Sequence, residues 1–158
     1  MGGLLALHAA LQRPTRVAAL VLVAPAVSLA DRLWDRLGEV KQQALLSGGA
    51  VNLGSDYVAP GADEVSLAFF EEARAFALPE APGSLDVRCP VRILHGALDD
   101  VVPVEVGQRL VSQLAGDDVV LTVAKDGDHR LSSQRDIGLL MSAVAQLEEA
   151  LQAAHQQE

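Results

Sequence analysis

The stretch VRILHGALDDVVP, residues 91–103, has the pattern expected of a strand, a turn, an acidic loop and the start of a helix, in that order. The run at 91–95 has the length and composition of a buried strand. Gly96 lets the backbone turn sharply where that strand ends, and Asp99 follows three residues later. Pro103 suits the first turn of the next helix, where no backbone N–H is needed. The stretch predicts one strand-to-helix step of an α/β fold, with a carboxylate above the strand end.

Two further apolar runs of strand length, 17–23 and 119–123, lie before and after this segment. Helical spacing of apolar residues is found at Gly2–Gln12, Val104–Leu114 and Gln134–Gln152. Strands that alternate with helices form right-handed crossovers and a parallel sheet. We therefore predict an α/β fold in which three parallel strands, at about 17–23, 91–95 and 119–123, are flanked by helices.

The middle of the chain has a different pattern. Two amphipathic helices are expected at 31–46 and 62–77, with a loop rich in Gly, Asn and Ser at 47–60 between them. These helices separate the first predicted strand from the second. The expected division is therefore a core made of 1–30 and 80–158, with a small helical insertion at 31–79.

Charge and cysteine content exclude several classes of function. The net charge is −9, which argues against binding to nucleic acid or to an anionic membrane surface. The single cysteine, Cys89, excludes a disulfide framework and a metal cluster built from cysteines. No run reaches the roughly 18 apolar residues that a membrane span requires, so no transmembrane segment is predicted.

The first 30 residues hold two arginines and no carboxylate, which leaves two interpretations open. One is a targeting segment, either a secretory signal with small residues at 27–30 or a transit peptide. The other is a packed helix followed by a buried strand. The long apolar stretch before residue 17 favours the second, so secretion is not predicted, and both the cytoplasm and the mitochondrial matrix remain compatible with the sequence.

A second loop with candidate reactive side chains, DGDHR at 126–130, directly follows the predicted strand 119–123. Neighbouring strands lie about 4.8 Å apart, and ligand sites of parallel sheets lie beyond the strand ends. Asp99 and His129 are therefore expected to meet as the acid and base of a nucleophilic triad. Asp100 is the alternative acid. The competing interpretations are that either aspartate caps the following helix, and that His129 is a solvated loop residue.

The remaining histidines and the cysteine receive structural interpretations. His95 is expected to be a structural residue at the strand end, and His8 a core residue on an apolar helix face. His155 is expected to be inert in the C-terminal tail. Cys89 precedes a strand, away from the predicted reactive edge, and is expected to be buried filler.

The loops HGALDDVVP and GDHRLS, together with the opening MGGLLALHAALQRP, resemble the α/β-hydrolase family. Within it, the chain is similar to the branch of mitochondrial palmitoyl-protein thioesterases and acyl-glucuronide esterases, in the pairing of LHG-x-x-DD-x-VP with DHR and in the segments RP-x-x-V-x-AL and FF-x-EA. The resemblance implies the family's order of nucleophilic Ser, acid and His, with Asp99 and His129 in the last two places. It also implies that Met1 and Gly2 occupy the last two positions of the G-x-S-x-G nucleophile elbow, so that the backbone N–H of Met1 would be an oxyanion donor. The chain would then be the C-terminal half of the fold.

The same resemblance implies what the insertion and the site would do. The segment 31–79 would be a helical cap, and its large side chains would be either an acyl-chain wall or the cap's own core: Trp34, Tyr57, Phe69 and Phe70. No metal or organic cofactor is implied. None of the serines in the chain lies in a G-x-S-x-G context, so the nucleophile is expected to belong to a preceding half.

Two functions of different classes follow. The first is a serine hydrolase that cleaves esters or thioesters of small molecules or acylated proteins. The second is an inactive truncated fragment or an interaction piece, because the strand at 17–23 would have an open apolar edge that invites pairing with another chain. A partner that supplies the missing half is a further alternative. The sequence predicts neither the acyl and leaving groups nor the oligomeric state.

Overall fold

A computed structural model describes residues 2–54, 59 and 62–156 of the chain. The chain divides into two compact units, Met1–Val27 with Pro79–Glu158, and Ser28–Leu78. We describe each unit by itself. Among the described residues, no helix has both the length and the apolar character needed to cross a bilayer.

The first unit is built on a three-stranded parallel sheet in the order β1-β4-β5. Its strands are β1 (Leu20–Val23), β4 (Val91–Gly96) and β5 (Val119–Ala124). The central strand β4 is buried along its whole length, which explains its nearly continuous apolar sequence, since both of its faces are covered. The predicted α/β fold with three parallel strands flanked by helices is confirmed.

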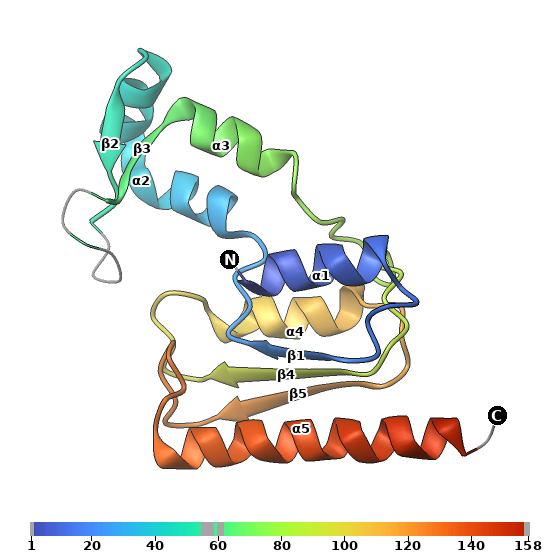
Figure 1. The fold of residues 1–158 in the computed structure, drawn as a ribbon. Helices are drawn as coiled ribbons and strands as arrows, with labels where there is room; N and C mark the ends of the chain where they lie inside the picture. The colour runs from blue at the N-terminus through green and yellow to red at the C-terminus, as the bar shows by residue number, and fades with distance from the viewer. Residues whose placement is uncertain (1, 55–58, 60–61, 157–158) are drawn as a thin grey trace. The chain divides into compact units, whose positions relative to one another are not determined.

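Three helices cover this sheet: α1 (Gly2–Gln12), α4 (Val104–Gln113) and α5 (Gln134–His155). Figure 1 shows α1 and α4 on one side of the sheet and α5 on the other. Successive side chains of β4 point to opposite faces of the sheet, so the strand packs against the helices on both sides. His95 faces Gly107 of α4, whereas Leu94 packs with Ala143 of α5. The α5 helix begins with a capping box, in which Ser133 and Asp136 exchange hydrogen bonds between side chain and backbone.

Strand β1 is shorter than the sequence predicts, because it begins at Leu20 and not at Val17. The hydrogen-bonded pairing of β1 with β4 explains this later start. Leu20 lies opposite Val91, the first residue of β4, and its backbone N–H donates to the carbonyl of Pro90. Residues 17–19 therefore have no β4 partner within the sheet, so they remain outside the strand although they are apolar. Conversely, β4 and β5 each extend one residue further than predicted, to Gly96 and Ala124.

The second unit contains α2 (Leu29–Leu46), α3 (Leu67–Arg74) and a short antiparallel sheet of β2 (Ala50–Asn52) and β3 (Glu64–Ser66). The sequence predicts a loop at 47–60 and a helix at 62–77 where these strands lie, so neither strand was predicted. Strands of three residues are too short to produce a recognisable alternation. The prediction of one regular helix at 31–46 is also incomplete, because Gly38 interrupts α2 with a φ of 71°.

Three aromatic residues of this unit, Trp34, Phe69 and Phe70, belong to its core. Phe70 packs edge-on against Trp34 and Phe69, with ring centroids 5.2 and 5.1 Å apart, and Leu45 and Val51 complete the cluster. This arrangement favours the second of the two interpretations of these side chains, a core and not an acyl-chain wall. Tyr57 lies outside the described residues, and the role of 31–79 as a cap remains a prediction.

Backbone contacts join the ends of β4 and β5. The N–H of Ala97 donates to the carbonyl of Ala124 at 2.8 Å, and that of Leu98 to the carbonyl of Gly127 at 2.9 Å. The two backbone segments approach so closely at Gly96 that a Cβ there would collide with the carbonyl oxygens of Gly127 and Asp128. A glycine at position 96 is therefore required for the strand exit and the following loop to lie side by side.

We expect Gly96→Ala to lower the free energy of unfolding by about 1–3 kcal/mol, the usual cost of forcing extra volume into a packed site. Thermal unfolding followed by circular dichroism measures the effect. Gly138→Ala is the matched control, because a Cβ at Gly138 meets nothing within 4 Å and alanine favours the helix by up to about 1 kcal/mol. Equal stability of the Gly96→Ala variant and the parent chain would contradict the assigned contact.

Within the described residues, β1 lies at one edge of its sheet, and Val23 at its end is 40% exposed. Edge strands offer unpaired N–H and C=O groups to other chains. We expect the 158-residue chain, expressed alone, to elute from gel filtration as an oligomer or an aggregate. A clean monomer with a sharp cooperative melting transition would show that this edge is protected.

Candidate active site

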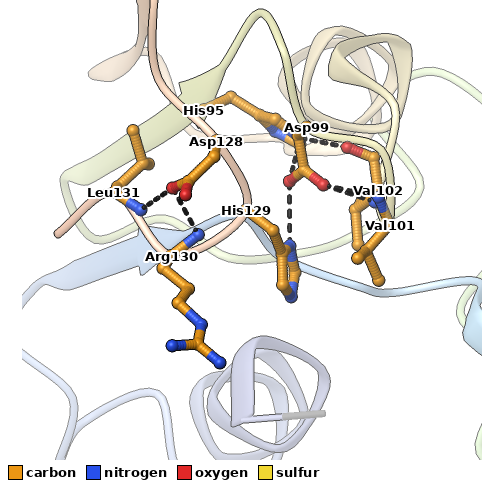
Figure 2. Close-up of polar contacts among 8 residues, drawn as sticks. All are labelled: His95, Asp99, Val101, Val102, Asp128, His129, Arg130 and Leu131. Carbon is orange, nitrogen blue, oxygen red and sulfur yellow. Dashed lines mark hydrogen bonds and ion pairs between the residues drawn. The ribbon is translucent and has the colours of Figure 1, made fainter. Parts of the chain in front are cut away.

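The two loops that carry the predicted acid and base leave the sheet at the same edge. One follows β4 and the other follows β5, and the two strands are parallel neighbours in register up to the pair Gly96 and Ala124. Figure 2 shows side chains of both loops converging on one region. Ligand sites of open parallel sheets lie beyond the carboxyl ends of the strands, so this edge is where chemistry is expected.

The side chain of Asp99 is buried and is oriented by its own loop. Its Oδ1 accepts hydrogen bonds from the backbone N–H groups of Val101 and Val102 at 2.9 and 2.7 Å. Its side chain is 0% exposed. A buried carboxylate requires such donors, because burial without them would be costly. With Oδ1 occupied by the loop, Oδ2 is the oxygen that faces across to the second loop.

His129 meets that oxygen. Its Nδ1 lies 2.9 Å from Asp99 Oδ2, and its side chain is 25% exposed. Because a carboxylate oxygen accepts, Nδ1 carries the hydrogen of this contact and Nε2 is the opposite nitrogen of the ring. Figure 2 shows the ring with Nδ1 toward Asp99 and its other edge turned away. Acid and imidazole thus have the orientation in which a carboxylate steadies a general base.

The His129 loop has its own support, which the sequence-based argument did not identify. Asp128 Oδ1 accepts hydrogen bonds from the N–H groups of Arg130 and Leu131 at 2.9 and 3.0 Å. Leu131 follows with a φ of 46°, an uncommon conformation for leucine. The sequence does hold a signal for this turn, because an aspartate commonly accepts hydrogen bonds from the backbone N–H groups two and three residues after it.

The two candidate acids differ in their surroundings. Asp99 Oδ2 lies 2.9 Å from His129 Nδ1, whereas Asp100, next along the loop, is exposed. Asp99 Oδ1 bonds the N–H groups of Val101 and Val102, which precede α4 (Val104–Gln113), and the N-cap residue of α4 is Pro103, with no side-chain cap. The interpretation that Asp99 caps the following helix is therefore wrong, because its carboxylate holds the turn that leads into the helix.

The other predicted residues take the following places. His95 is fully buried at the end of β4. His8 is half-buried on α1, so its predicted core position is only partly realised. Cys89 is also half-buried, and this burial raises the pKa of its thiol, which lowers the fraction present as reactive thiolate.

Two predicted positions fall where the structure says little. Met1, the predicted backbone oxyanion donor, lies outside the described residues, and so does the side chain of His155. In the part of the chain that is described, no group of three or more His, Cys, Asp or Glu residues is placed to hold a metal ion.

No protein-family model matches the chain. Curated relatives do match. The chain is 34% identical over 148 residues to the mitochondrial palmitoyl-protein thioesterase ABHD10 of Homo sapiens, covering 93% of this chain and 47% of that protein. The Mus musculus protein of the same name is 33% identical over 147 residues. The chain thus spans about half the length of the curated relatives it matches.

Solved structures agree with these relatives. Alpha/beta hydrolase domain-containing protein 10 from mouse superimposes with a TM-score of 0.82 at 33% identity, over 94% of this chain and 59% of that one. A monoacylglycerol lipase from Paleococcus ferrophilus, at 19% identity and a TM-score of 0.56, shares the fold. These likenesses cover almost all of the chain and agree with the parallel sheet described above. Together these comparisons support a place for the chain in the α/β-hydrolase family, within the branch of the mitochondrial palmitoyl-protein thioesterases.

Proposed function

We propose that this chain supplies the acid and the base of a serine hydrolase that cleaves carboxylic esters or thioesters. The observation that carries the proposal is the 2.9 Å contact between Asp99 Oδ2 and His129 Nδ1 at the sheet edge. Supporting it are the family and the order of acid before histidine along the chain, which is the order of α/β-hydrolase triads. In this proposal Asp99 orients the ring and stabilises the imidazolium, while His129 moves the proton through Nε2.

The proposed reaction has two stages. A serine Oγ attacks the carbonyl carbon while its proton passes to His129 Nε2, and a bond forms from Oγ to carbon. The tetrahedral intermediate then expels the alcohol or thiol, which takes the proton from His129. Water then attacks the acyl group on the serine while its proton passes to His129. The serine leaves with that proton, and the carboxylic acid is released. The serine of the family pattern would stand directly before Met1, and the Met1 N–H would help to hold the oxyanion.

The substrate class is proposed from the relatives. The human protein is named a palmitoyl-protein thioesterase, which supports an acyl thioester of a protein, while small esters share the same chemistry. The net charge of −9 makes nucleic acid an unfavourable partner. The same relative is named as mitochondrial, which supports the mitochondrial matrix, and the cytoplasm remains the other compartment compatible with the sequence.

The alternative is a chain that performs no catalysis and acts, if at all, through association. The position of β1 at the sheet edge supports this alternative. The two proposals differ in one sequence that can be read directly, the coding frame upstream of Met1. A Gly-x-Ser immediately before Met1 would complete the nucleophile elbow and favour the enzyme, and its absence would favour the alternative.

We expect no labelling of the purified 158-residue chain by a fluorophosphonate probe, because such probes react with activated serines and none of its serines has the elbow context. A protein extended upstream through an in-frame Gly-x-Ser is expected to be labelled. Labelling of the 158-residue chain that disappears in His129→Ala would show that one of its own serines is activated.

In the extended protein, Asp99→Asn is expected to lower kcat for a p-nitrophenyl ester by about 10⁴-fold, by analogy with the loss when a triad aspartate becomes an amide. His129→Ala is expected to cost a similar factor. Asp100→Asn is the matched comparison, since it makes the same change one residue along, and it is expected to leave kcat nearly unchanged. The reverse ranking of the two asparagine variants would transfer the acid role to Asp100.

A further inference from the structure

His95 is a buried titratable residue that the proposed mechanism does not use. It lies at the end of β4 with a side chain that is 0% exposed. Its Nε2 is 2.8 Å from the backbone carbonyl oxygen of Val102, and the same nitrogen lies 3.5 Å from Asp99 Oδ2. The ring therefore stands directly behind the loop that carries the acid, as Figure 2 shows.

The hydrogen on the His95 ring can be placed from these contacts. A carbonyl oxygen only accepts, so Nε2 carries the hydrogen and donates it to Val102. The other nitrogen, Nδ1, is buried and has no hydrogen-bond partner among the described residues. A Cβ on Gly107 of α4 would come within 2.9 Å of Nδ1. The ring is thus held on one side by the Val102 carbonyl and on the other by the close backbone of α4.

Val102 connects His95 to the acid. Its carbonyl accepts from His95, while its N–H donates to Asp99 Oδ1 at 2.7 Å. Asp99 Oδ2 in turn contacts His129. The three contacts form one chain from the strand to the imidazole, and displacement of Val102 would remove one of the two N–H donors that orient the Asp99 carboxylate.

We propose that His95 is a positioning residue, which holds the 97–103 loop through Val102 so that Asp99 keeps His129 in the Nδ1–H tautomer. The proposal deepens the proposed function and rests on the assignment of Asp99 and His129 to it. Filling the core would require only an apolar group of similar size at position 95. Positioning requires in addition a donor directed at the Val102 carbonyl, and the two roles can therefore be separated by substitution.

The test is the tautomer of His129, read from imidazole ¹⁵N shifts by magic-angle-spinning NMR, which serves monomers and assemblies alike. His129→Gln identifies the signals. The parent chain is expected to show His129 as Nδ1–H. In His95→Leu, which fills the space without a donor, that signal is expected to be lost to the Nε2–H form. In His95→Gln, whose amide can donate to Val102, it is expected to be retained.

Gly107→Ala provides a second route in case His95→Leu does not fold. Its methyl group would press on Nδ1 and tilt the ring without altering either loop, so the same loss of the His129 Nδ1–H signal is expected. Backbone shifts verify that each variant is folded. An unchanged His129 signal in folded His95→Leu or folded Gly107→Ala would overturn the proposal, and so would equal loss in His95→Leu and His95→Gln.

This readout needs no turnover, so it separates the two proposals. If the extended protein does not hydrolyse esters and yet the His129 tautomer follows His95 as described, the positioning role holds and the proposed function fails. If the extended protein is an active hydrolase whose His129 tautomer is indifferent to His95, the proposed function holds and the positioning role is wrong.

Discussion

The close backbone approach between Gly96 and the loop at Gly127 is the constraint on which the candidate site depends. Asp99 and His129 are 30 positions apart in sequence and belong to different loops, and neither loop could place its side chain correctly alone. The hydrogen bonds from Ala97 to Ala124 and from Leu98 to Gly127 join the two strand exits. A side chain at position 96 would separate them, so the missing Cβ at one residue sets the distance between acid and base.

Asp99 is the polar centre around which this edge is organised. Its two oxygens have different partners, since Oδ1 accepts from backbone N–H groups of its own loop and Oδ2 faces His129. The fold thus fixes the orientation of this carboxylate, as the acid–base role proposed for it would require. Asp128 gives the second loop a similar internal support. The two loops are therefore stiffened independently and then joined.

Sequence reasoning succeeded where a signal is local and long enough, and it failed where the structure depends on partners. The run at 91–95 was recognisable because a strand buried on both faces must be apolar throughout. The start of β1 was not, since residues 17–19 are as apolar as those that follow and only the register with Val91 ends the ladder. The strands β2 and β3 were missed because three residues carry no period, and their pairing is decided by contacts within the second unit.

The sequence by itself determined the α/β class, the three parallel strands and the identity of the two loops, because hydrophobic periodicity and glycine-bearing strand exits are written in consecutive residues. Only the tertiary structure decided which of two adjacent aspartates meets His129, since neighbouring side chains in a turn diverge in space. It alone showed that the His95 ring reaches the Val102 carbonyl. That contact depends on the path of the folded backbone, and no spacing along the chain encodes its geometry.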